Sequence, residues 1–188
     1  IVLDSRRVES GFCFIATRGE RVDGHDFIGQ VLQKGALCVI CERVPEGVSG
    51  NFIIVKDSLQ ALQDVAAYYR KTLQIPVIGI TGSVGKTSTK EFIAGVLSRK
   101  FRVLRTEGNY NNEIGVPLTL LQIRPEHEIA VVEMGINHFG EMRRLSRMAR
   151  PDVCVLTNIG ECHLEFLGSR EGVLRAKSEI FEYMQEYG

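Results

Sequence analysis

The segment PVIGITGSVGKTSTKEF, residues 76–92, decides how the second half of this chain folds. It opens with a short apolar run, which predicts a buried strand. Gly82 and Gly85 follow, and glycine lets the backbone turn sharply and approach a ligand closely. The residues from Lys86 onward predict a helix. A strand, a glycine loop and a helix in this order are typical of a loop that binds phosphate groups.

The chemistry of such a loop follows from its residue types. The amides of the turn and of the first helical turn point toward an anion. Lys86 can reach the β- and γ-phosphates of a nucleotide, and the hydroxyl of Thr87 can bind Mg²⁺. The usual pattern has a further glycine where Ile80 stands, so the motif here is GxxGKT. The alternative is an ordinary glycine turn that carries a solvated lysine. The chain contains no NKxD string of the kind with which GTPases read their base.

Three further apolar stretches, residues 101–106, 128–135 and 152–158, predict strands with helical or loop segments between them. Strands that are apolar on both faces and alternate with helices indicate a parallel sheet with helices on both sides. We expect the helix after the glycine loop to bury one apolar face, made of Phe92, Ile93, Val96 and Leu97.

The first part of the chain predicts a smaller α/β unit. Strands are expected in GFCFIAT, ALCVICE and NFIIV, and a helix in DGHDFIGQVLQKG that ends at Gly35. Asp57 and Ser58 begin a further helix. Its expected apolar face consists of Leu59, Leu62, Val65, Ala66 and Tyr69. The pattern breaks at Ile75-Pro76, so we expect a boundary near residues 72–76 and two domains, 1–74 and 75–188.

Composition narrows the possible partners. The chain has 188 residues, with 23 Lys+Arg and 23 Asp+Glu, so no net charge attracts nucleic acid or an anionic membrane. No apolar run approaches the roughly 20 residues that span a bilayer, and no leader pattern is visible. We expect neither a nucleic-acid partner nor membrane insertion. The chain begins with Ile and stops within a helical pattern, so we expect it to be part of a longer protein with a later domain.

The five cysteines are Cys13, Cys38, Cys41, Cys154 and Cys162. An odd number without regular spacing argues against secreted disulfides. The Cys38-Cys41 pair is a CxxC, but in a strand its side chains point to opposite faces, and the chain has no second CxxC. Buried strand thiols in a reducing cytoplasm are therefore expected, with a metal or redox role as the alternative.

Two polar residues follow predicted strands in the second half. Glu133 ends the strand in EIAVVEMG, at the sheet edge where open α/β folds bind ligands, and a carboxylate there is suited to Mg²⁺. A helix-capping or surface carboxylate is the alternative. His163 lies just past another strand end, where an ordinary surface histidine is equally compatible with the spacing.

Lys177 stands in the middle of an apolar helical face. In REGVLRAKSEIFEYM, helical spacing places Val173, Leu174, Ile180, Phe181 and Met184 on that face. None of the residues three or four positions from Lys177 is acidic, and burial lowers the pKa of an ammonium group. A neutral amine can react with CO₂ to give a carbamate, an anion that could hold Mg²⁺. A lysine whose head reaches solvent is the alternative.

With these motifs taken together, the chain resembles the Mur ligase family, the ATP-dependent amide-forming enzymes of peptidoglycan synthesis. The family's phosphate loop is TGxxGKT[ST], which TGSVGKTS matches. DSRRVESGFCFIATRGERVDGHDFI resembles the family's UDP-binding domain. NYNNEIGVPLTLL and EMGINHFGEM look most like the branch that adds D-alanyl-D-alanine. The implied fold is a small N-terminal α/β UDP-binding domain followed by an incomplete P-loop parallel-sheet ATPase domain.

The resemblance implies roles for particular residues. The ATP phosphates would be bound by Thr81, Gly82, Ser83, Val84, Gly85, Lys86, Thr87 and Ser88. The magnesium ligands would be Thr87, Glu133, His163 and Lys177, the last of them carbamylated because AKSEI matches the family's context for that lysine. The catalytic residues would be Lys86, Lys177, His163 and Asn112. Asn111, Asn112 and Asn137 would lie near the γ-phosphate or the substrate. The UDP-sugar site would be lined by Ser5, Arg6, Asp23, Gly24 and His25, for which turn and cap roles are the alternative.

The implied activity is an ATP-dependent ligase that joins D-alanyl-D-alanine to UDP-N-acetylmuramoyl-tripeptide through an acyl phosphate. The resemblance also implies a cytoplasmic protein, and we expect a monomer. A sister ligase that adds an amino acid to UDP-MurNAc-peptide remains an alternative, and so does a P-loop switch ATPase. A folylpolyglutamate synthase fits less well, because those enzymes tend to have GKGS and lack this N-terminal domain. In the family a third domain closes on the site, so we expect this stretch alone to turn over poorly.

Overall fold

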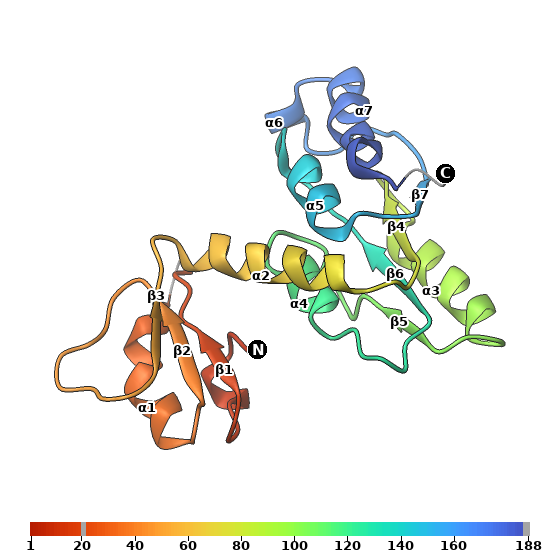
Figure 1. Cartoon of the computed structure of the whole chain (residues 1–188). Coiled ribbons are helices and arrows are strands. Elements are labelled where there is room, and N and C mark those ends of the chain that lie inside the picture. Colours follow the sequence, from red (N-terminus) through yellow and green to blue (C-terminus); the bar gives the residue numbers. More distant parts are fainter. Residues whose placement is uncertain (20–21, 186–188) are drawn as a thin grey trace. The chain divides into compact units, whose positions relative to one another are not determined.

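The computed structural model describes residues 1–19 and 22–185 (Figure 1). Glu20 and Arg21, inside the stretch similar to a UDP-binding domain, and residues 186–188, at the end of the second predicted domain, lie outside the described residues. The chain forms two compact units, Ile1–Val65 and Ala66–Gly188. This division falls inside one helix, α2 (Ser58–Thr72), whereas the sequence pattern breaks only at Ile75-Pro76.

The first unit is built on a parallel sheet in the order β1-β2-β3. Its strands are β1 (Cys13–Ile15), β2 (Cys38–Cys41) and β3 (Phe52–Ile54), each inside a stretch predicted to be a strand. Helix α1 (Ile28–Gln33) precedes Gly35, whose positive φ of 88° ends the helix as expected. The 3₁₀ helices are Ser5–Arg7 and Gly24–Phe27. The buried core consists of Val8, Phe14, Ala16, Ile28, Val31, Val39 and Cys41.

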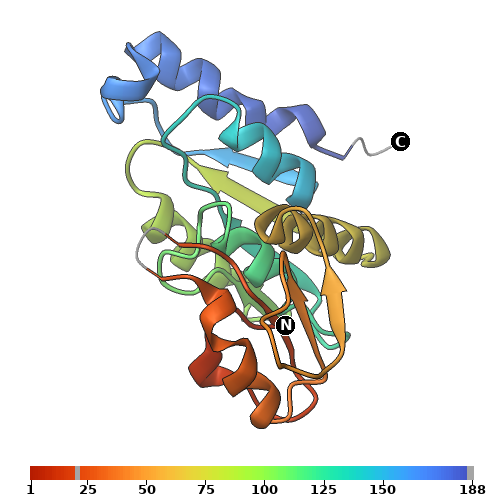
Figure 2. The ribbon, with the colours of Figure 1, turned by 90° about the vertical axis from the view of Figure 1, so that its left-hand side faces the viewer.

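The second unit contains a four-stranded parallel sheet in the order β5-β6-β4-β7. The strands are β4 (Val77–Thr81), β5 (Val103–Arg105), β6 (Ile129–Glu133) and β7 (Val153–Leu156). The α-helices are α3 (Lys86–Leu97), α4 (Gly115–Leu120), α5 (Glu141–Ala149), α6 (Leu164–Leu167) and α7 (Arg170–Ser178), and a 3₁₀ helix (Glu179–Tyr183) follows. In Figure 2 the arrows of β4 and β7 point the same way, so their carboxyl ends meet at one edge.

Helices cover both faces of this sheet, as the doubly apolar strands predict. Ile80 and Val131 pack with Ala94 of α3 on one face. Val77 and Val132 belong to the larger core on the other face, together with residues of α4, α5 and α7. Alternate residues of one strand therefore point into different cores. The predicted α/β class with a parallel sheet is confirmed.

The last turns of α2 attach that helix to the second unit. Ala66 lies in its main core. The hydroxyl of Tyr69 donates to the carbonyl oxygen of Ile123 at 2.6 Å. The buried guanidinium of Arg70 donates to the carbonyl oxygen of Ala149 at 2.8 Å and to the Asp152 carboxylate at 3.0 Å. That carboxylate also accepts the backbone N–H of Val77, so this pair holds the start of β4.

Two expected apolar faces differ from the structure. On α3, Phe92 and Val96 are 75% and 73% exposed, whereas Lys90 and Ala94 are buried. The helix has more apolar residues than its contact with the sheet can cover. The face of α3 that packs against the sheet includes Lys90, and Phe92 and Val96 lie on the other side.

The second difference concerns the end of the Lys177 face, where Val173 and Ile180 are buried but Phe181 and Met184 are about half exposed. Leu174 is also 48% exposed. The α-helix ends at Ser178 and continues as a 3₁₀ helix. With 3.0 instead of 3.6 residues per turn, the later residues rotate away from the predicted face.

Four of the five cysteines lie in strands, and all five are free thiols. Cys41 is fully buried, and Cys13, Cys38 and Cys154 are partly buried. Cys162, for which no strand was predicted, lies partly buried in the loop after β7. Within residues 1–19 and 22–185, no helix is both long and apolar enough to cross a membrane.

Candidate active site

The glycine loop connects β4, an inner strand of the sheet, to α3. Gly82 has φ of 147° and Gly85 has φ of 80°, both in the region that favours glycine. A Cβ on Gly82 would overlap the side-chain hydroxyl of Thr157, which follows β7. The space around Gly85 is open. The loop is therefore packed against β7 on one side and open at the start of the helix.

Residues after β7 hold the loop in this shape. The backbone N–H of Ser83 donates to the carbonyl oxygen of Asn158 at 3.1 Å, and that of Val84 donates to the Asn158 side chain at 3.1 Å. The hydroxyl of Ser83 accepts the N–H of Gly160 at 2.9 Å. The thiol of Cys162 also lies 3.1 Å from that hydroxyl. The sequence did not point to Asn158 as a contact of this loop.

The start of α3 presents unsatisfied donors. Among the described residues, the amides of residues 85–88 have no hydrogen-bond acceptor. These are the groups that a helix N-terminus leaves free, and they form a site for an anion. The hydroxyl of Thr81, the last residue of β4, is buried without a hydrogen-bond partner among the described residues. Lys86 folds back over the loop, and its ammonium donates to the carbonyl oxygen of Gly82 at 2.9 Å.

Glu133 lies beside this loop, at the carboxyl end of β6. Its side chain is only 2% exposed. One carboxylate oxygen accepts from the Thr87 hydroxyl at 3.0 Å, and the other accepts from the Asn111 side-chain amide at 2.8 Å. The Lys90 ammonium lies 3.8 Å from the first oxygen. Three residues named by the sequence, Thr87, Asn111 and Glu133, are thus in direct contact, and Lys90 was missed.

The oxygen pair of Thr87 and Glu133 fits Mg²⁺. Adjacent oxygen ligands of an octahedral ion with bonds of about 2.0–2.1 Å lie about 3 Å apart, which matches the 3.0 Å between these two atoms. Magnesium is usually held by one or two protein carboxylates together with substrate phosphates. Within the described part of the chain, no group of three or more His, Cys, Asp or Glu side chains could hold a metal by itself.

Lys177 is 1% exposed and lies on α7. Within residues 1–19 and 22–185, no carboxylate lies within ion-pair distance of its ammonium. Burial lowers the pKa of Lys177, and the charge of Lys86 lowers it further, while Cys162 raises it. The predicted burial of this lysine is therefore confirmed.

His163 stands at the start of α6 with a left-handed backbone, φ 54°. Partial burial lowers the pKa of His163, and the charges of Lys177 and Lys86 lower it further.

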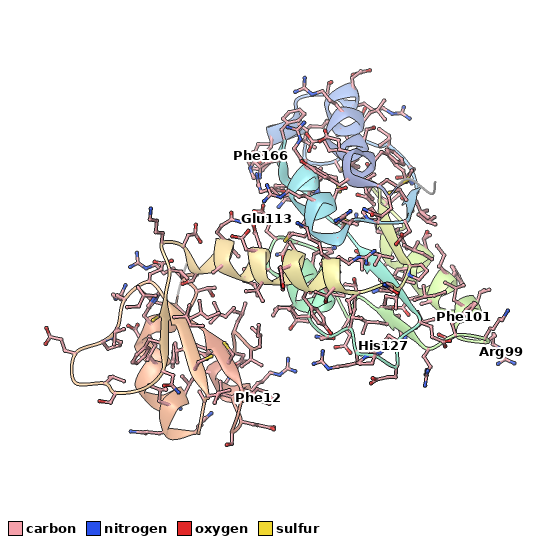
Figure 3. The ribbon with its side chains drawn as sticks, viewed as in Figure 1. Phe12, Arg99, Phe101, Glu113, His127 and Phe166 are labelled. Atoms are coloured by element: carbon pink, nitrogen blue, oxygen red, sulfur yellow. The ribbon has the colours of Figure 1, made fainter. Side chains whose placement is uncertain are left out.

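The asparagines differ in their roles. The side-chain oxygen of Asn112 accepts the backbone N–H groups of Ile114 and Gly115 at 3.1 and 2.9 Å, just before α4. Asn137 is exposed, and its backbone N–H donates to Glu141 at 2.7 Å. The ring of His138, the next residue, lies 4.2 Å from that of Phe166. Glu113, next to Asn112, pairs with Arg144 (Figure 3 labels Phe166 and Glu113).

The predicted UDP-sugar residues lie in the first unit. Asp23 caps the 3₁₀ helix Gly24–Phe27 by accepting the N–H of His25. His25 is buried, with its Nε2 accepting the N–H of Glu42 at 2.9 Å and its Nδ1 lying 2.6 Å from Asp23. A Cβ on Gly24 would lie within 2.8 Å of the Thr17 carbonyl oxygen.

The remaining two residues of that set, Ser5 and Arg6, belong to the 3₁₀ helix Ser5–Arg7. Arg6 is exposed and pairs with Asp4 at 2.8 Å. The carbonyl oxygen of Ser5 accepts from the Lys34 ammonium at 2.9 Å.

The chain matches two family models along nearly its whole length. Residues 1–78 match "Mur ligase family, catalytic domain" and residues 80–188 match "Mur ligase middle domain". A UDP-N-acetylmuramoyl-tripeptide–D-alanyl-D-alanine ligase from Bacillus subtilis is 47% identical over 190 residues, which cover 100% of this chain and 42% of that protein.

The solved structures that are similar to the chain include two from different bacteria. A crystal structure of MurF from Acinetobacter baumannii has a TM-score of 0.94 and 44% identity, covering 100% of this chain and 41% of that one. MurF from Thermotoga maritima in complex with ADP has a TM-score of 0.91 and 40% identity, and the match covers 100% of this chain and 44% of that one. The chain therefore spans about two fifths of the length of these relatives. By these matches and by the geometry of its glycine loop, the chain belongs to the Mur ligase family.

Proposed function

We propose that the protein to which this chain belongs is an ATP-dependent ligase that joins D-alanyl-D-alanine to UDP-N-acetylmuramoyl-tripeptide. The observation that carries the proposal is the row of unsatisfied amides at residues 85–88, directly beside the Thr87–Glu133 oxygen pair. This arrangement suits a triphosphate with a divalent ion. The names of the similar proteins, including a relative in complex with ADP, support the reaction and the nucleotide.

The chemical problem is that a carboxylate resists attack by an amine. Transfer of the γ-phosphoryl group of ATP to the tripeptide carboxylate gives an acyl phosphate. The amine of D-alanyl-D-alanine then attacks the acyl carbon and releases phosphate. The first step brings a carboxylate and a triphosphate together, so positive charge and hydrogen-bond donors are needed to offset their repulsion.

Residues of this chain supply both the positive charge and the hydrogen-bond donors. The free amides of residues 85–88 would bind the phosphate oxygens. Lys86, released from the Gly82 carbonyl oxygen, would turn toward the β- and γ-phosphates and stabilise the charge that develops during transfer. Asn111, Asn112 and Asn137 would position the γ-phosphate or the tripeptide, and of these Asn111 already contacts Glu133.

Thr87 and Glu133 would hold Mg²⁺, which neutralises phosphate charge and favours in-line geometry when bound. His163 would be a further magnesium ligand at the same edge of the sheet. We propose that Lys177 carries a carbamate, because its ammonium is buried without a carboxylate partner and because AKSEI matches the family's context. The carbamate would add an anionic metal ligand to those supplied by Thr87 and Glu133.

Each of the two predicted domains would bind a different ligand. Residues 1–74 would bind the UDP end of the substrate, with Ser5, Arg6, Asp23, Gly24 and His25 shaping or lining that site. The internal hydrogen bonds of His25 favour a shaping role for this residue. Residues 75–188 would bind ATP. We propose a cytoplasmic monomer, which suits a substrate made inside the cell.

The deciding experiment measures phosphate release by the full-length protein with ATP while UDP-MurNAc-tripeptide and D-alanyl-D-alanine are omitted in turn. Parallel reactions contain UDP-MurNAc-peptides with single amino acids in place of the dipeptide. Release that requires both the tripeptide and the dipeptide supports the proposed ligase. Release that requires a single amino acid in place of the dipeptide assigns a sister ligase instead. Phosphate release that depends on neither the tripeptide nor the dipeptide would assign a P-loop ATPase instead of a ligase.

A further inference from the structure

We propose that Lys90 is the built-in counter-ion of Glu133 and competes with a divalent cation for that carboxylate. The cation would then bind tightly only when a nucleotide is also present. The inference deepens the proposed function, because it takes Glu133 as the residue that meets the metal. Nothing in the family motif points to Lys90, which lies one turn beyond the GKT residues on α3.

The first observation is an alternating row of four charges. The Lys90 ammonium lies 3.8 Å from Glu133 and 3.2 Å from Glu91. Glu91 in turn pairs with Arg105 at 2.9 Å. The outer pair is about half exposed, whereas the side chains of Lys90 and Glu133 are only 1% and 2% exposed. The row therefore runs from solvent to the buried edge of the nucleotide loop.

The second observation is that Lys90 supplies the positive charge nearest to Glu133. Among the described residues, no other cation lies within ion-pair distance of this carboxylate. The Thr87 hydroxyl and the Asn111 amide also donate to it, but both groups are neutral. A buried carboxylate without a counter-charge is costly, so Lys90 stabilises Glu133 in the absence of a metal.

The consequence for a divalent ion follows from Coulomb's law. An ion that approaches the Glu133 oxygen shared with Thr87 also approaches the Lys90 ammonium. Its repulsion by Lys90 is twice that of a monovalent ion at the same distance. Lys90 is buried and also paired with Glu91, so moving its ammonium away from the ion would disturb that pair. Nucleotide phosphates near residues 85–88 would offset it, which makes the binding of cation and nucleotide cooperative and reciprocal.

The test measures Mn²⁺ affinity of the full-length protein without nucleotide, by electron paramagnetic resonance, at a pH well above the ordinary carboxyl range. Lys90→Gln is expected to bind nucleotide-free Mn²⁺ about tenfold more tightly than the wild type. Lys90→Arg keeps the charge and should resemble the wild type. Lys100→Gln, an exposed lysine of the same unit, controls for the change in net charge. An unchanged or weakened Mn²⁺ affinity in a folded Lys90→Gln protein would overturn the proposal.

A second variant covers the case in which Lys90→Gln does not fold. Glu91→Gln removes the outer partner of Lys90 and leaves the ammonium to Glu133 alone, so nucleotide-free Mn²⁺ should bind several-fold more weakly. Glu128→Gln is the matched control, because its carboxylate is similarly exposed, 48% against 49%, and also pairs with an arginine. Equal Mn²⁺ affinities in the two variants would contradict the proposal. Binding is measured without ligation, so failure of the proposed reaction would show separately, in the phosphate-release assay.

Discussion

The side-chain hydroxyl of Thr157 donates a hydrogen bond of 2.7 Å to the carbonyl oxygen of Val84. This bond ties the tip of the nucleotide loop to the residue that follows β7. The same hydroxyl occupies the space into which a side chain at position 82 would project. The loop therefore takes its shape from a neighbouring strand as well as from its own glycines, and this contact leads to the first prediction.

Gly82→Ala should impair nucleotide binding more than Gly85→Ala. Alanine at position 82 meets the Thr157 hydroxyl and an unfavourable φ, a combined cost of about 3 kcal/mol. Alanine at position 85 meets only the left-handed backbone, at about 1–2 kcal/mol. Titration with a fluorescent ATP analogue measures both. The double variant Gly82→Ala/Thr157→Ala should recover part of the affinity, and equal losses in the two single variants would contradict this reading.

Lys86→Ala should abolish ligation and leave binding of the UDP-substrate intact. The variant loses a cation that stabilises the transferring phosphoryl group, and groups of this kind contribute about 10²–10³-fold to the rate. Phosphate release reports the first effect, and calorimetry with UDP-MurNAc-tripeptide reports the second. Amide synthesis at the wild-type rate would show that this lysine is not part of the reaction.

Lys177 should take up labelled bicarbonate. Its buried position lowers its pKa, so more of the amine is neutral and reactive near neutral pH than for an exposed lysine. In ¹³C-bicarbonate the folded full-length protein should show a carbamate carbon signal by NMR. Lys177→Met should lack this signal and Lys100→Met should retain it. A wild-type spectrum without a carbamate resonance would remove the carbamate from the mechanism.

Arg70→Ala should destabilise the second unit by about 3 kcal/mol, because it leaves Asp152 and three carbonyl oxygens without this buried partner. Chemical denaturation followed by circular dichroism measures the change. Arg70→Lys keeps the charge but loses the several N–H donors of the guanidinium group. Its stability should lie between those of the wild type and of Arg70→Ala. Arg102→Ala, at an exposed arginine of the same unit, should change stability by less than about 1 kcal/mol.

Protonation of Asp23 in acid should lower the stability of the first unit. The hydrogen bond from the His25 backbone amide, helped by the His25 ring and Arg43, lowers the pKa of Asp23 below its ordinary 3.8. A lowered folded-state pKa gives stability that is present above 3.8 and is lost as the pH falls toward the folded-state pKa.

Asp23→Asn can keep the helix cap but loses the charge, at a cost of about 1 kcal/mol near neutral pH. Hydrogen exchange of the His25 and Glu42 amides, compared between variant and wild type at each pH, measures this difference. The two proteins should converge in acid. A difference that stays constant with pH would mean that the Asp23 charge contributes nothing.

Much of the fold could be predicted from local patterns. Apolar runs such as PVIGI and EIAVVE identify buried parallel strands because burial on both faces leaves no polar alternation. The glycine loop identifies itself, because Gly82 and Gly85 occupy backbone conformations that other residues seldom adopt. Lys177 could be recognised as unusual because helical periodicity places it among apolar neighbours. Each of these features depends on residues close together in the sequence.

The tertiary structure alone decided which distant side chains meet. Asn158 and Thr157 contact the loop only because β7 lies beside β4, a pairing across more than 70 residues. Lys90 reaches Glu133 because of the way α3 is turned on the sheet, which also leaves Phe92 and Val96 exposed. Sequence periodicity determines that a helix has an apolar face, but the neighbouring strands determine which residues that face includes. Long-range packing therefore settled the electrostatics of the site, and local chemistry settled its presence.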